Sequence, residues 1–504
     1  MDKATPLSQI LSLARAGFPG RAWALFVAEG WDRVTDDPKA LTLKGRLLKD
    51  QAKAAKVPLQ VAEQIRLYGE AAAAYEAAAE IRTDSYPLIN AAALALLGGD
   101  PDRAVELAAQ VLAMVDGNPE EGENAYWREA TRSEALLLMN REEEAQQSLA
   151  LAVSHLPDAW EDHAATIGQF ALILAKQDRD ANWLDQHRPA PSVHFSGMIR
   201  LQENDTKAIQ SIRNYIEQEQ PGFAYGALAA GSDLLFAQAF LDYKHKNSNA
   251  SQLHVILPFP IDQFRDLSVR PFGQGWLDRF DAVLEQAEKV DILGLDDPPL
   301  MLAVEIADRM AMGQAVRNAN NLQSTAKAVT VAGAGEALRR QLAFWRDSGK
   351  ELMIIEGKRK PTSVGEFASE QTSHSVGTLI WISNGDDVQI NQLLESVVSV
   401  QSNEKGHWFA CDDPEQAYDL AALIAQSELP DVQVSMLYDI MDITVPSTSL
   451  LRRAEVLAGV SQSGVLVTDL VGAMSLTLIG CAHSIEEIGE LKTVWGSQPL
   501  WRVL

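Results

Sequence analysis

Alanine-rich segments with a helical period fill residues 1–187, and they limit the fold of this part more than any other feature of the chain. Apolar residues recur at spacings of three and four, as in Leu43 and Leu47, which is the period of one face of an α-helix. Turn-forming strings interrupt the period near Pro101 and Pro119. The string LINAAALALLGGDPDRAVELAAQVLAMV predicts two helices joined by a tight turn. We therefore expect antiparallel helix pairs in this part.

Helix pairs of this kind are typical of a tetratricopeptide-type array, whose repeat is about 34 residues long. The match to that repeat is loose, and a non-repeating helical bundle fits the pattern as well. In an array each pair packs only on its neighbours and leaves one open face, which usually serves as a binding or oligomerisation surface. We expect residues 1–187 to form an all-α domain that binds a protein partner.

Three strings in this region carry a resemblance to a known family: DPKALTLKGRLLKD, SYPLINAAALALLGGD and YWREATRSEALLL. They resemble the TRAFs-binding helical region of MAP kinase kinase kinases and its bacterial relatives. The resemblance implies a regulatory helical scaffold. It does not imply a kinase, because the motif set of protein kinases is absent from the sequence.

The charge balance makes several classes of partner unfavourable. The 504 residues include 43 Lys and Arg against 69 Asp and Glu, a formal net charge of −26. Such a surface repels nucleic-acid phosphates and anionic lipids, and the basic run at 358–360 is short. The N-terminus lacks the apolar core of a signal peptide, and no apolar run reaches the roughly 18 residues of a membrane helix. We expect a cytoplasmic protein that binds neither nucleic acid nor membrane.

The two cysteines, Cys411 and Cys481, predict no metal or disulfide chemistry. Two cysteines are too few for a disulfide framework. They are also too few for a zinc site, because no histidines occur at matching spacing. We expect both to be small buried apolar residues.

The pattern changes near Pro189, where predicted strands begin to alternate with helices. The predicted strands cover 193–197, 223–225, 253–257 and 352–355. Alternation of this kind predicts a parallel, Rossmann-like α/β domain, here over residues 188–357. Residues 358–375 carry turn formers without a period, which predicts a linker.

Two glycine-bearing turns follow predicted strands of this domain and precede helices. One is Ser196-Gly197, and the other is the string GALAAGSD at 226–233. Glycine permits close backbone approach, and a helix N-terminus presents N–H groups with a partial positive charge. Together they predict a phosphate site at the carboxyl edge of the sheet. Tight packing of helix on sheet explains the same glycines equally well.

The order of motifs, FSG, then YGALAAGSDLLFAQAFL, then LHVILPFPIDQFRDLSV and GWLDRFDAVLEQA, resembles the SMF/DprA–LOG (SLOG) superfamily. Members are Rossmann-like sensors or processors of nucleotides and their derivatives. The resemblance implies that this part binds a nucleotide-derived ligand. The residues onto which ligand contacts carry over are Ser196, Gly197, Gly226, Ala227, Gly231, Ser232 and Asp233, and more weakly Pro258 and Phe259.

The sequence departs from the hydrolytic branch of that superfamily. The Pro-Gly-Gly-x-Gly-Thr loop of the phosphoribohydrolases is absent. Glu305 is the nearest carboxylate with a plausible pocket role, and a solvated helical face explains it about as well. Asp233 either hydrogen-bonds a ribose or caps the helix that begins there. We therefore assign no catalytic residue.

The last part, residues 376–504, predicts an α+β domain. Its predicted strands cover 377–383, 432–437 and 464–468, and its predicted helices cover 387–399 and 413–426. The strings GTLIWIS, WFACDDPEQAYDLAALI, LLRRAEVLAGVSQSGVLVT and IGELKTVWGSQPLWRVL resemble class III nucleotide cyclases in their order. Because cyclase-type domains pair, the resemblance implies that this domain supports a homodimer. The transition-state positions of that family fall on Arg452 and Val456.

By the same resemblance, the metal-binding aspartate positions fall on Ser383 and Lys405. Two divalent ions need carboxylate oxygens, which a serine and a lysine do not supply. Asp386 and Asp387 lie nearby but past the strand end. We expect a degenerate cyclase-like domain with no metal site, no required cofactor and no cyclase activity.

Together, the predicted helical array, α/β domain and cyclase-like domain indicate a non-enzymatic signalling sensor or scaffold. The helical array would bind a protein partner, and the middle domain would bind a nucleotide-derived ligand. The alternative is an enzyme whose middle domain cleaves a nucleotide or an NAD-like molecule, and a pocket carboxylate with a raised pKa would favour it. A third reading is a structural adaptor whose glycine-rich turns bind nothing.

Overall fold

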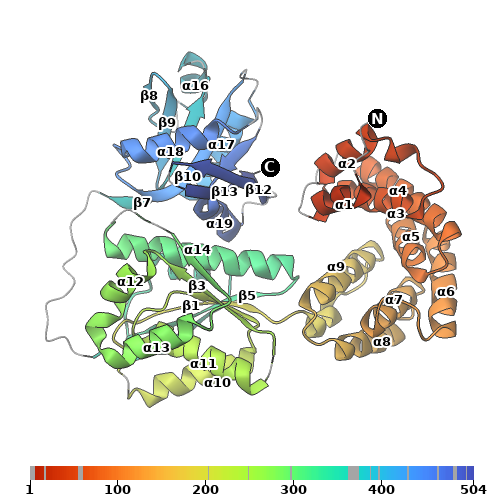
Figure 1. Cartoon of the computed structure of the whole chain (residues 1–504), viewed down its shortest axis with the longest axis horizontal. Coiled ribbons are helices and arrows are strands. Elements are labelled where there is room, and N and C mark those ends of the chain that lie inside the picture. The colour runs from red at the N-terminus through yellow and green to blue at the C-terminus, as the bar shows by residue number, and fades with distance from the viewer. Residues whose placement is uncertain are drawn as a thin grey trace. The chain divides into compact units, whose positions relative to one another are not determined.

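The structure is a computed structural model. It describes every residue except 1–5, 16–18, 55–60, 203, 248, 294, 296–297, 361–373, 386, 395–397, 428, 430, 462–464, 481–484, 495 and 504. The chain divides into two compact units, Met1–Pro189 and Ala190–Leu504. In Figure 1 the first unit runs from red to yellow-brown and the second from yellow-green to blue.

The first unit is a helical-repeat region, as the periodicity predicts. Its helices are α1 (Leu7–Arg15), α2 (Pro19–Ala28), α3 (Pro38–Ala54), α4 (Val61–Ile81), α5 (Ser85–Leu97), α6 (Pro101–Gly117), α7 (Ala125–Leu138), α8 (Glu142–His155) and α9 (Trp160–Lys176), with 3-10 turns η1 (Trp31–Arg33) and η3 (Asn182–His187). From α3 to α8 each helix packs against the next one along the chain, and α5 and α7 also contact α9.

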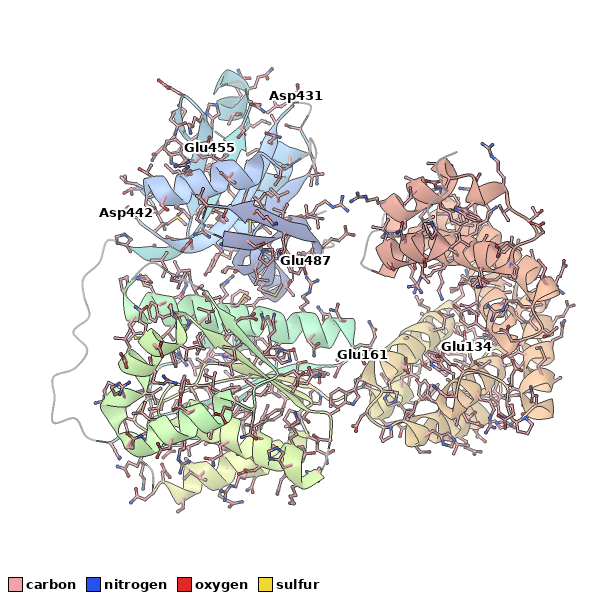
Figure 2. The ribbon with its side chains drawn as sticks, viewed as in Figure 1. Glu134, Glu161, Asp431, Asp442, Glu455 and Glu487 are labelled. Atoms are coloured by element: carbon pink, nitrogen blue, oxygen red, sulfur yellow. The ribbon has the colours of Figure 1, made fainter. Side chains whose placement is uncertain are left out.

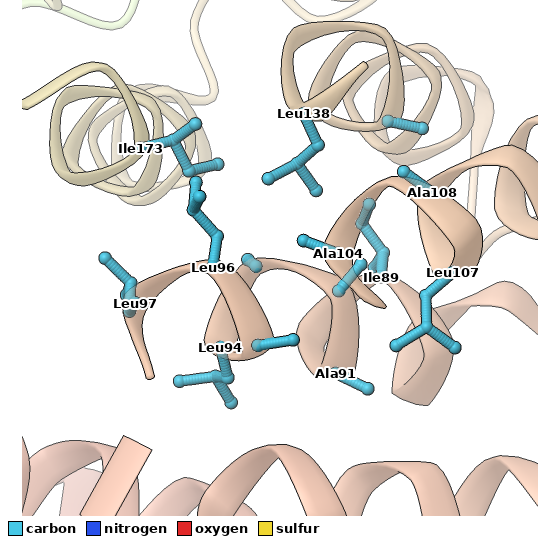
Figure 3. Close-up of a cluster of buried hydrophobic side chains, with 14 of the residues drawn as sticks. Ile89, Ala91, Leu94, Leu96, Leu97, Ala104, Leu107, Ala108, Leu138 and Ile173 are labelled. Atoms are coloured by element: carbon cyan, nitrogen blue, oxygen red, sulfur yellow. The ribbon is translucent and has the colours of Figure 1, made fainter. Parts of the chain in front are cut away.

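Local sequence explains where these helices begin and how closely they pack. The Asp100 side chain accepts a hydrogen bond from the Arg103 N–H at the start of α6, which satisfies a free N–H of the first turn. Small side chains occupy the helix contacts, and Figure 3 shows Ala91 and Ala104 among the leucines of α5 and α6. Alanine permits close helix approach at little cost in side-chain entropy.

The second unit begins with a sheet whose strands are all parallel, in the order β4-β3-β2-β1-β5-β6. The strands are β1 (Ser192–Ser196), β2 (Phe223–Gly226), β3 (Gln252–Leu257), β4 (Lys289–Ile292), β5 (Ala326–Ala332) and β6 (Leu352–Glu356). The helices are α10 (Thr206–Glu219), α11 (Ser232–Asn247), α12 (Ile261–Ser268), α13 (Gln274–Leu284), α14 (Leu300–Asn321) and α15 (Arg340–Asp347), with the 3-10 turn η4 (Arg270–Phe272). The parallel α/β prediction is confirmed, although the sequence did not predict β4 and β5.

Strand β1 has an apolar face and a polar face. Figure 1 shows α14 on one side of the sheet and α10, α11 and α13 on the other. Phe195 stacks on Phe236 of α11 with ring centroids 4.8 Å apart, and Asn318 of α14 donates to the Ser192 hydroxyl at 3.0 Å. Because strand side chains alternate, His194 and Ser196 lie on the same face as Ser192, toward α14.

The rest of the second unit is a mixed sheet with helices, in the strand order β12-β13-β11-β10-β7-β9-β8. Its strands are β7 (Ser375–Ser383), β8 (Gln401–Asn403), β9 (Gly406–Cys411), β10 (Gln433–Met441), β11 (Leu466–Thr468), β12 (Ile485–Thr493) and β13 (Gly496–Val503). Its helices are α16 (Asp387–Leu394), α17 (Pro414–Ala425), α18 (Thr448–Ala458) and α19 (Leu470–Ile479). The helix predicted to reach residue 399 is described as α16 up to Leu394; residues 395–397 lie outside the described residues, and Val398 and Ser399 are not helical.

The α/β part and this C-terminal part share a packed interface along α14. Helix α19 packs on α14, and Gly313 allows the close approach, because a Cβ there would lie 2.3 Å from the carbonyl oxygen of Met474. The range predicted as a linker also begins within the fold. Lys358 accepts a hydrogen bond from the Gln202 N–H at 2.9 Å, and residues 361–373 lie outside the described residues.

Three further observations concern expectations drawn from composition. None of the helices that the structure describes is long and apolar enough to cross a membrane. Within the described ranges, no group of three or more His, Cys, Asp or Glu residues is arranged to hold a metal ion. Cys411 is buried and not in a disulfide, and burial raises the pKa of its thiol to about 11. Cys481 lies outside the described residues.

Candidate functional site at the carboxyl end of β1

The polar face of β1 carries two buried groups with unused hydrogen-bonding atoms. Nδ1 of His194 lies 3.1 Å from the carbonyl oxygen of Tyr225, and both His194 and Ser196 are buried. Nε2 of His194 and Oγ of Ser196 have no hydrogen-bond partner among the described residues. Because buried polar atoms are almost always paired, two orphan atoms on one strand face need an explanation, such as water or a ligand.

Helix α14 and the segment after β5 contribute the two residues of an ion pair whose charges act on His194. Asp308 of α14 is buried, and its Oδ2 lies 2.8 Å from Nη1 of Arg339, just before α15. The two atoms form an ion pair without the alignment of a hydrogen bond. The two charges of the ion pair act on the pKa of His194 in opposite directions.

Burial dominates the protonation of the site. It lowers the pKa of His194 to about 4, with Asp308 opposing the shift and Arg339 adding to it. Burial likewise raises the pKa of Asp233 to about 7, against the opposing influence of Arg339 and with a further increase from Asp308. Near neutral pH, His194 is therefore uncharged and the Asp233 carboxyl is partly protonated.

Asp233 lies at the start of α11, and neighbouring residues of the chain donate hydrogen bonds to its carboxylate. The Ser232 hydroxyl donates to Oδ1 of Asp233 at 3.3 Å, and the Ala229 N–H also bonds to this carboxylate. Since the donor Ala229 belongs to the turn before α11 and the acceptor Asp233 belongs to the helix, this bond holds the turn against the helix. The sequence left open a ribose contact or a helix cap for Asp233, and this bond to the preceding turn is a different contact from both.

The glycines of the 226–233 turn allow other backbone segments of the protein to approach the turn closely. Gly231 has φ +137°, and a Cβ there would lie 2.3 Å from the carbonyl oxygen of Met198. That carbonyl accepts the Ser232 N–H at 3.1 Å, so it uses an N–H of the first turn of α11. Gly197 lies against Ser232 and Val331 of β5. These contacts match the packing alternative, and phosphate binding by this turn stays a prediction.

The remaining residues that the sequence predicted lie at the ends of β2 and β3 and on α14. Gly226 ends β2, and Ala227 follows it in a half-buried position. Pro258 and Phe259 follow β3, two strands away from β1, so they are not part of the His194 cluster. Glu305 lies one helical turn before Asp308, and burial raises its pKa while Arg340 opposes the shift.

The sequence analysis missed His194, Asp308 and Arg339. A signal for His194 was present, because SVHFS alternates polar and apolar residues inside a predicted buried strand. Asp308 is a charged residue in the largely apolar string VEIADRMAM. Arg339 carries no such signal, since its place depends on the path of the chain after β5.

The cyclase-like positions of the C-terminal part hold structural contacts. Ser383 ends β7, and its hydroxyl accepts a hydrogen bond from Trp381 Nε1 at 2.9 Å. Lys405 lies in the turn between β8 and β9 and pairs with Glu455 of α18 at 3.1 Å. Asp386 lies outside the described residues, and Asp387 begins α16.

Comparisons with known proteins bear on the first unit. A family model described as Tetratricopeptide Repeats-Sensor (TPR-S) matches residues 5–95, which include α1 to α4 and most of α5. The first helices of the chain are similar to tetratricopeptide-type sensor repeats. No curated protein matches the chain. Among solved structures, a mutant O-GlcNAc transferase from Thermobaculum terrenum is 10% identical, covers 66% of this chain and 76% of its own, and has a TM-score of 0.18.

The TPR-like region contains a polar cluster that joins three of its helices. Nζ of Lys49 in α3 donates to Oε1 of Gln169 in α9 at 2.9 Å, and Gln169 also bonds to Glu134 of α7. Glu134 is labelled in Figure 2. Burial lowers the pKa of Lys49 to about 8 and raises that of Glu134 to about 7. This cluster connects helices that are far apart in the sequence.

Proposed function

We propose that the chain is a sensor or scaffold whose TPR-like region binds a protein partner and whose α/β part binds a nucleotide-derived ligand. The TPR-like repeats indicate the scaffold role, because helical arrays expose a continuous surface to partners. The ligand is proposed at the carboxyl end of β1, beside the point where the strand order reverses between β1 and β5. The SLOG-like order of motifs supports the nucleotide class.

The observation that carries the ligand proposal is the pair of orphan atoms, His194 Nε2 and Ser196 Oγ. Leaving a buried polar atom unpaired costs about 1–3 kcal/mol. A ligand hydroxyl that donates to Nε2, which is an acceptor because Nδ1–H faces the Tyr225 carbonyl, and that accepts from the Ser196 hydroxyl would remove that cost. Arg339 lies beside them, and its planar guanidinium suits the oxygens of a single phosphate or carboxylate.

Calorimetric titration of the full chain with AMP, ADP, ATP and NAD tests this proposal. Replacing Ser196 by Ala removes one orphan atom, and we expect it to weaken binding about fivefold. Ser192→Ala is the matched control, since Ser192 lies on the same face of β1 but its hydroxyl is already bonded to Asn318. Absence of heat with every nucleotide, or equal loss in both variants, would contradict the site.

Hydrolysis of the bound ligand is a second candidate function, favoured by the raised pKa of Asp233. A carboxyl group that titrates near the working pH is suited to general acid–base catalysis. Chromatography of ATP and NAD incubated with the protein tests it, with Asp233→Asn as the variant. Product that forms equally with the variant would exclude Asp233 from such a reaction.

For the C-terminal part, the cyclase-like resemblance supports a regulatory, homodimer-forming role without catalysis. Light scattering of the full chain gives the oligomeric state directly. A mass of one chain at all concentrations would contradict the dimer.

A further inference from the structure

Strand β6 forms an open edge of the parallel sheet. Among the strands that the structure describes, β6 pairs only with β5 and is the last in the order β4-β3-β2-β1-β5-β6. An edge strand keeps a row of backbone N–H and C=O groups to which another strand can add. Natural proteins usually protect such a row, and the two edges of this sheet differ in that respect.

Charged side chains protect the opposite edge, β4, whereas the centre of β6 is apolar. Nζ of Lys289 lies 3.0 Å from Oδ1 of Asp291, and Gln314 donates to Oδ2 of Asp291 at 2.7 Å. On β6, Met353 is 44% exposed and Ile354 is 49% exposed. Neighbouring exposed apolar residues on an edge strand are typical of a strand that pairs with another chain.

The pairing with β5 determines which backbone groups of β6 stay free. The carbonyl of Glu351 accepts the Ala328 N–H at 3.0 Å, and the Gly357 N–H donates to Ala332 at 2.9 Å. Because backbone groups alternate in side along a strand, the odd-numbered residues of β6 direct theirs toward β5. The even-numbered residues direct theirs outward: Leu352, Ile354 and Glu356. Within the part of the chain that the structure describes, no hydrogen bond uses these outward groups.

A second copy of β6 can pair with these groups in two antiparallel registers that centre on an exposed apolar residue. Hydrogen-bonded residues of antiparallel strands face each other, so even-numbered residues must face even-numbered ones. With a two-fold axis at Ile354, Lys350 faces Lys358 of the second copy, and like charges directly opposite are unfavourable. With the axis at Met353, Lys350 faces Glu356 of the second copy. The two-fold axis repeats this favourable pair, so charge selects the register centred on Met353.

The two charges that meet in this register are not neutralised within the chain. Nζ of Lys350 donates to the Ser348 hydroxyl at 3.1 Å and lies 5.8 Å from the ring centroid of Trp345. Both of these groups are uncharged. Glu356 is exposed. Among the described residues, neither Lys350 nor Glu356 forms an ion pair, so each is available to a residue of opposite charge.

Between the charged pairs the same register brings apolar side chains together. Leu352 faces Ile354 on both sides of the axis, and Met353 faces Met353. An apolar centre with a charged rim is the usual composition of a protein interface.

We propose that a second copy of the chain adds to β6 in this register and extends the parallel sheet across a two-fold axis at Met353. The added strand bonds to the outward backbone groups of β6 and covers Met353 and Ile354. Each β6 has 5 residues, and a strand pair of that length is small beside a standard interface of roughly 1,600 Å². We therefore expect a weak dimer whose amount depends on concentration. This contact is separate from the homodimer proposed for the C-terminal part.

Disulfide cross-linking of the full chain tests the register. Residues that face each other in a non-hydrogen-bonded antiparallel pair have Cα atoms about 4.5 Å apart, which a disulfide can span. Met353→Cys is therefore expected to form a covalent dimer on mild oxidation with diamide. Ile354→Cys is the matched control, because the axis at Met353 sets the two copies of position 354 two residues out of line, beyond the roughly 7 Å limit of a disulfide.

The yield of covalent dimer decides between the outcomes. The wild type, which has Cys411 and Cys481, gives the baseline. We expect at least about fivefold more covalent dimer from Met353→Cys than from Ile354→Cys. Equal yields, or no yield above the baseline, would overturn the proposal. Light scattering measured alongside separates this result from the C-terminal homodimer, which gives a dimer mass without a disulfide at position 353.

A charge exchange tests the pair that selects the register, with the Met353→Cys dimer yield as the readout. Glu356→Lys places two lysines opposite each other and Lys350→Glu places two carboxylates there, and we expect each to lower the yield about fivefold. The double variant restores opposite charges, so we expect its yield to return to within about twofold of the starting value. Thermal melts check that the variants fold. No loss in the single variants, or a larger loss in the double variant, would overturn the register.

Discussion

Asp308 and Arg309 are consecutive residues of α14, yet their side chains contact different parts of the second unit. Asp308 pairs with Arg339 at the carboxyl end of β1. Arg309 Nε donates to Ser475 at 3.1 Å, and its guanidinium lies 4.5 Å from the ring centroid of Tyr438 in the C-terminal part. Because consecutive residues of an α-helix are rotated by about 100°, one helix forms a wall of the site and holds the C-terminal part.

Loss of Arg309 is expected to weaken the interface along α14. Arg309→Met removes the hydrogen bond to Ser475 and the cation–π contact with Tyr438, and we expect it to lower the free energy of unfolding by about 1–3 kcal/mol. Urea unfolding measures the change. Arg346→Met is the control, since Arg346 forms an exposed ion pair with Asp347 that contributes little. If both variants unfold like the wild type, the interface does not depend on Arg309.

Acidification is expected to destabilise the fold through His194. Its folded-state pKa of about 4 lies below the ordinary 6.5, so the unfolded chain binds the proton more readily. The stabilising effect of neutral His194 is complete above pH 6.5 and is lost as the pH falls toward 4. Between pH 7 and pH 4 we expect the wild type to lose about 2–4 kcal/mol more than His194→Gln. Parallel pH profiles of unfolding would contradict the burial of a neutral imidazole.

Asp233 is expected to have the opposite dependence on pH. Its pKa is raised from 3.8 to about 7, so the folded state binds the proton more readily than the unfolded chain. Stability therefore falls as the pH rises from 4 to 7, and the full cost applies above 7. We expect Asp233→Asn to be more stable than the wild type at pH 8 by about 1–4 kcal/mol, and nearly equal at pH 4. Differential scanning fluorimetry across this range measures the difference, and a constant offset would contradict it.

The TPR-like region is expected to fold without the rest of the chain. Its core is built from contacts between consecutive helices, and the Lys49–Gln169–Glu134 cluster lies entirely within it. Circular dichroism of residues 1–187 should show a helical spectrum with a cooperative melt. A mixed α/β spectrum or a gradual melt would contradict an independent unit.

Cyclase activity is expected to be absent from the homomeric protein. By the resemblance to class III cyclases, the metal-binding aspartate positions fall on Ser383, which is bonded to Trp381, and on Lys405, which is paired with Glu455. Loss of one such ligand commonly costs orders of magnitude in rate. Chromatography after incubation with ATP or GTP and Mg²⁺ or Mn²⁺ should show no cyclic nucleotide. Turnover that disappears in an Asp386→Ala, Asp387→Ala double variant would show that the metal site has a different register.

The sequence by itself determined the features that depend on local period and on turn residues. The helices of the first unit follow from apolar spacing and from breaks such as Pro101, because helix hydrogen bonds join residues four apart. Strands β1, β2 and β3, and the glycine turn that ends at Asp233, were also predictable from short strings. Each of these features depends on neighbours in the chain.

Only the tertiary structure decided which of these residues meet. His194, Asp308 and Arg339 come from β1, α14 and the segment after β5, and the crossover into β5 brings them together. The positions of β4 and β5 in the sheet depend on pairing between distant segments. The protonation of Asp233 depends on the same packing, because removal from water raises its pKa, whereas its neighbours in the chain, Ser232 and Ala229, lower it. Burial is a property of the whole fold, so the sequence identified Asp233 but did not determine its chemistry.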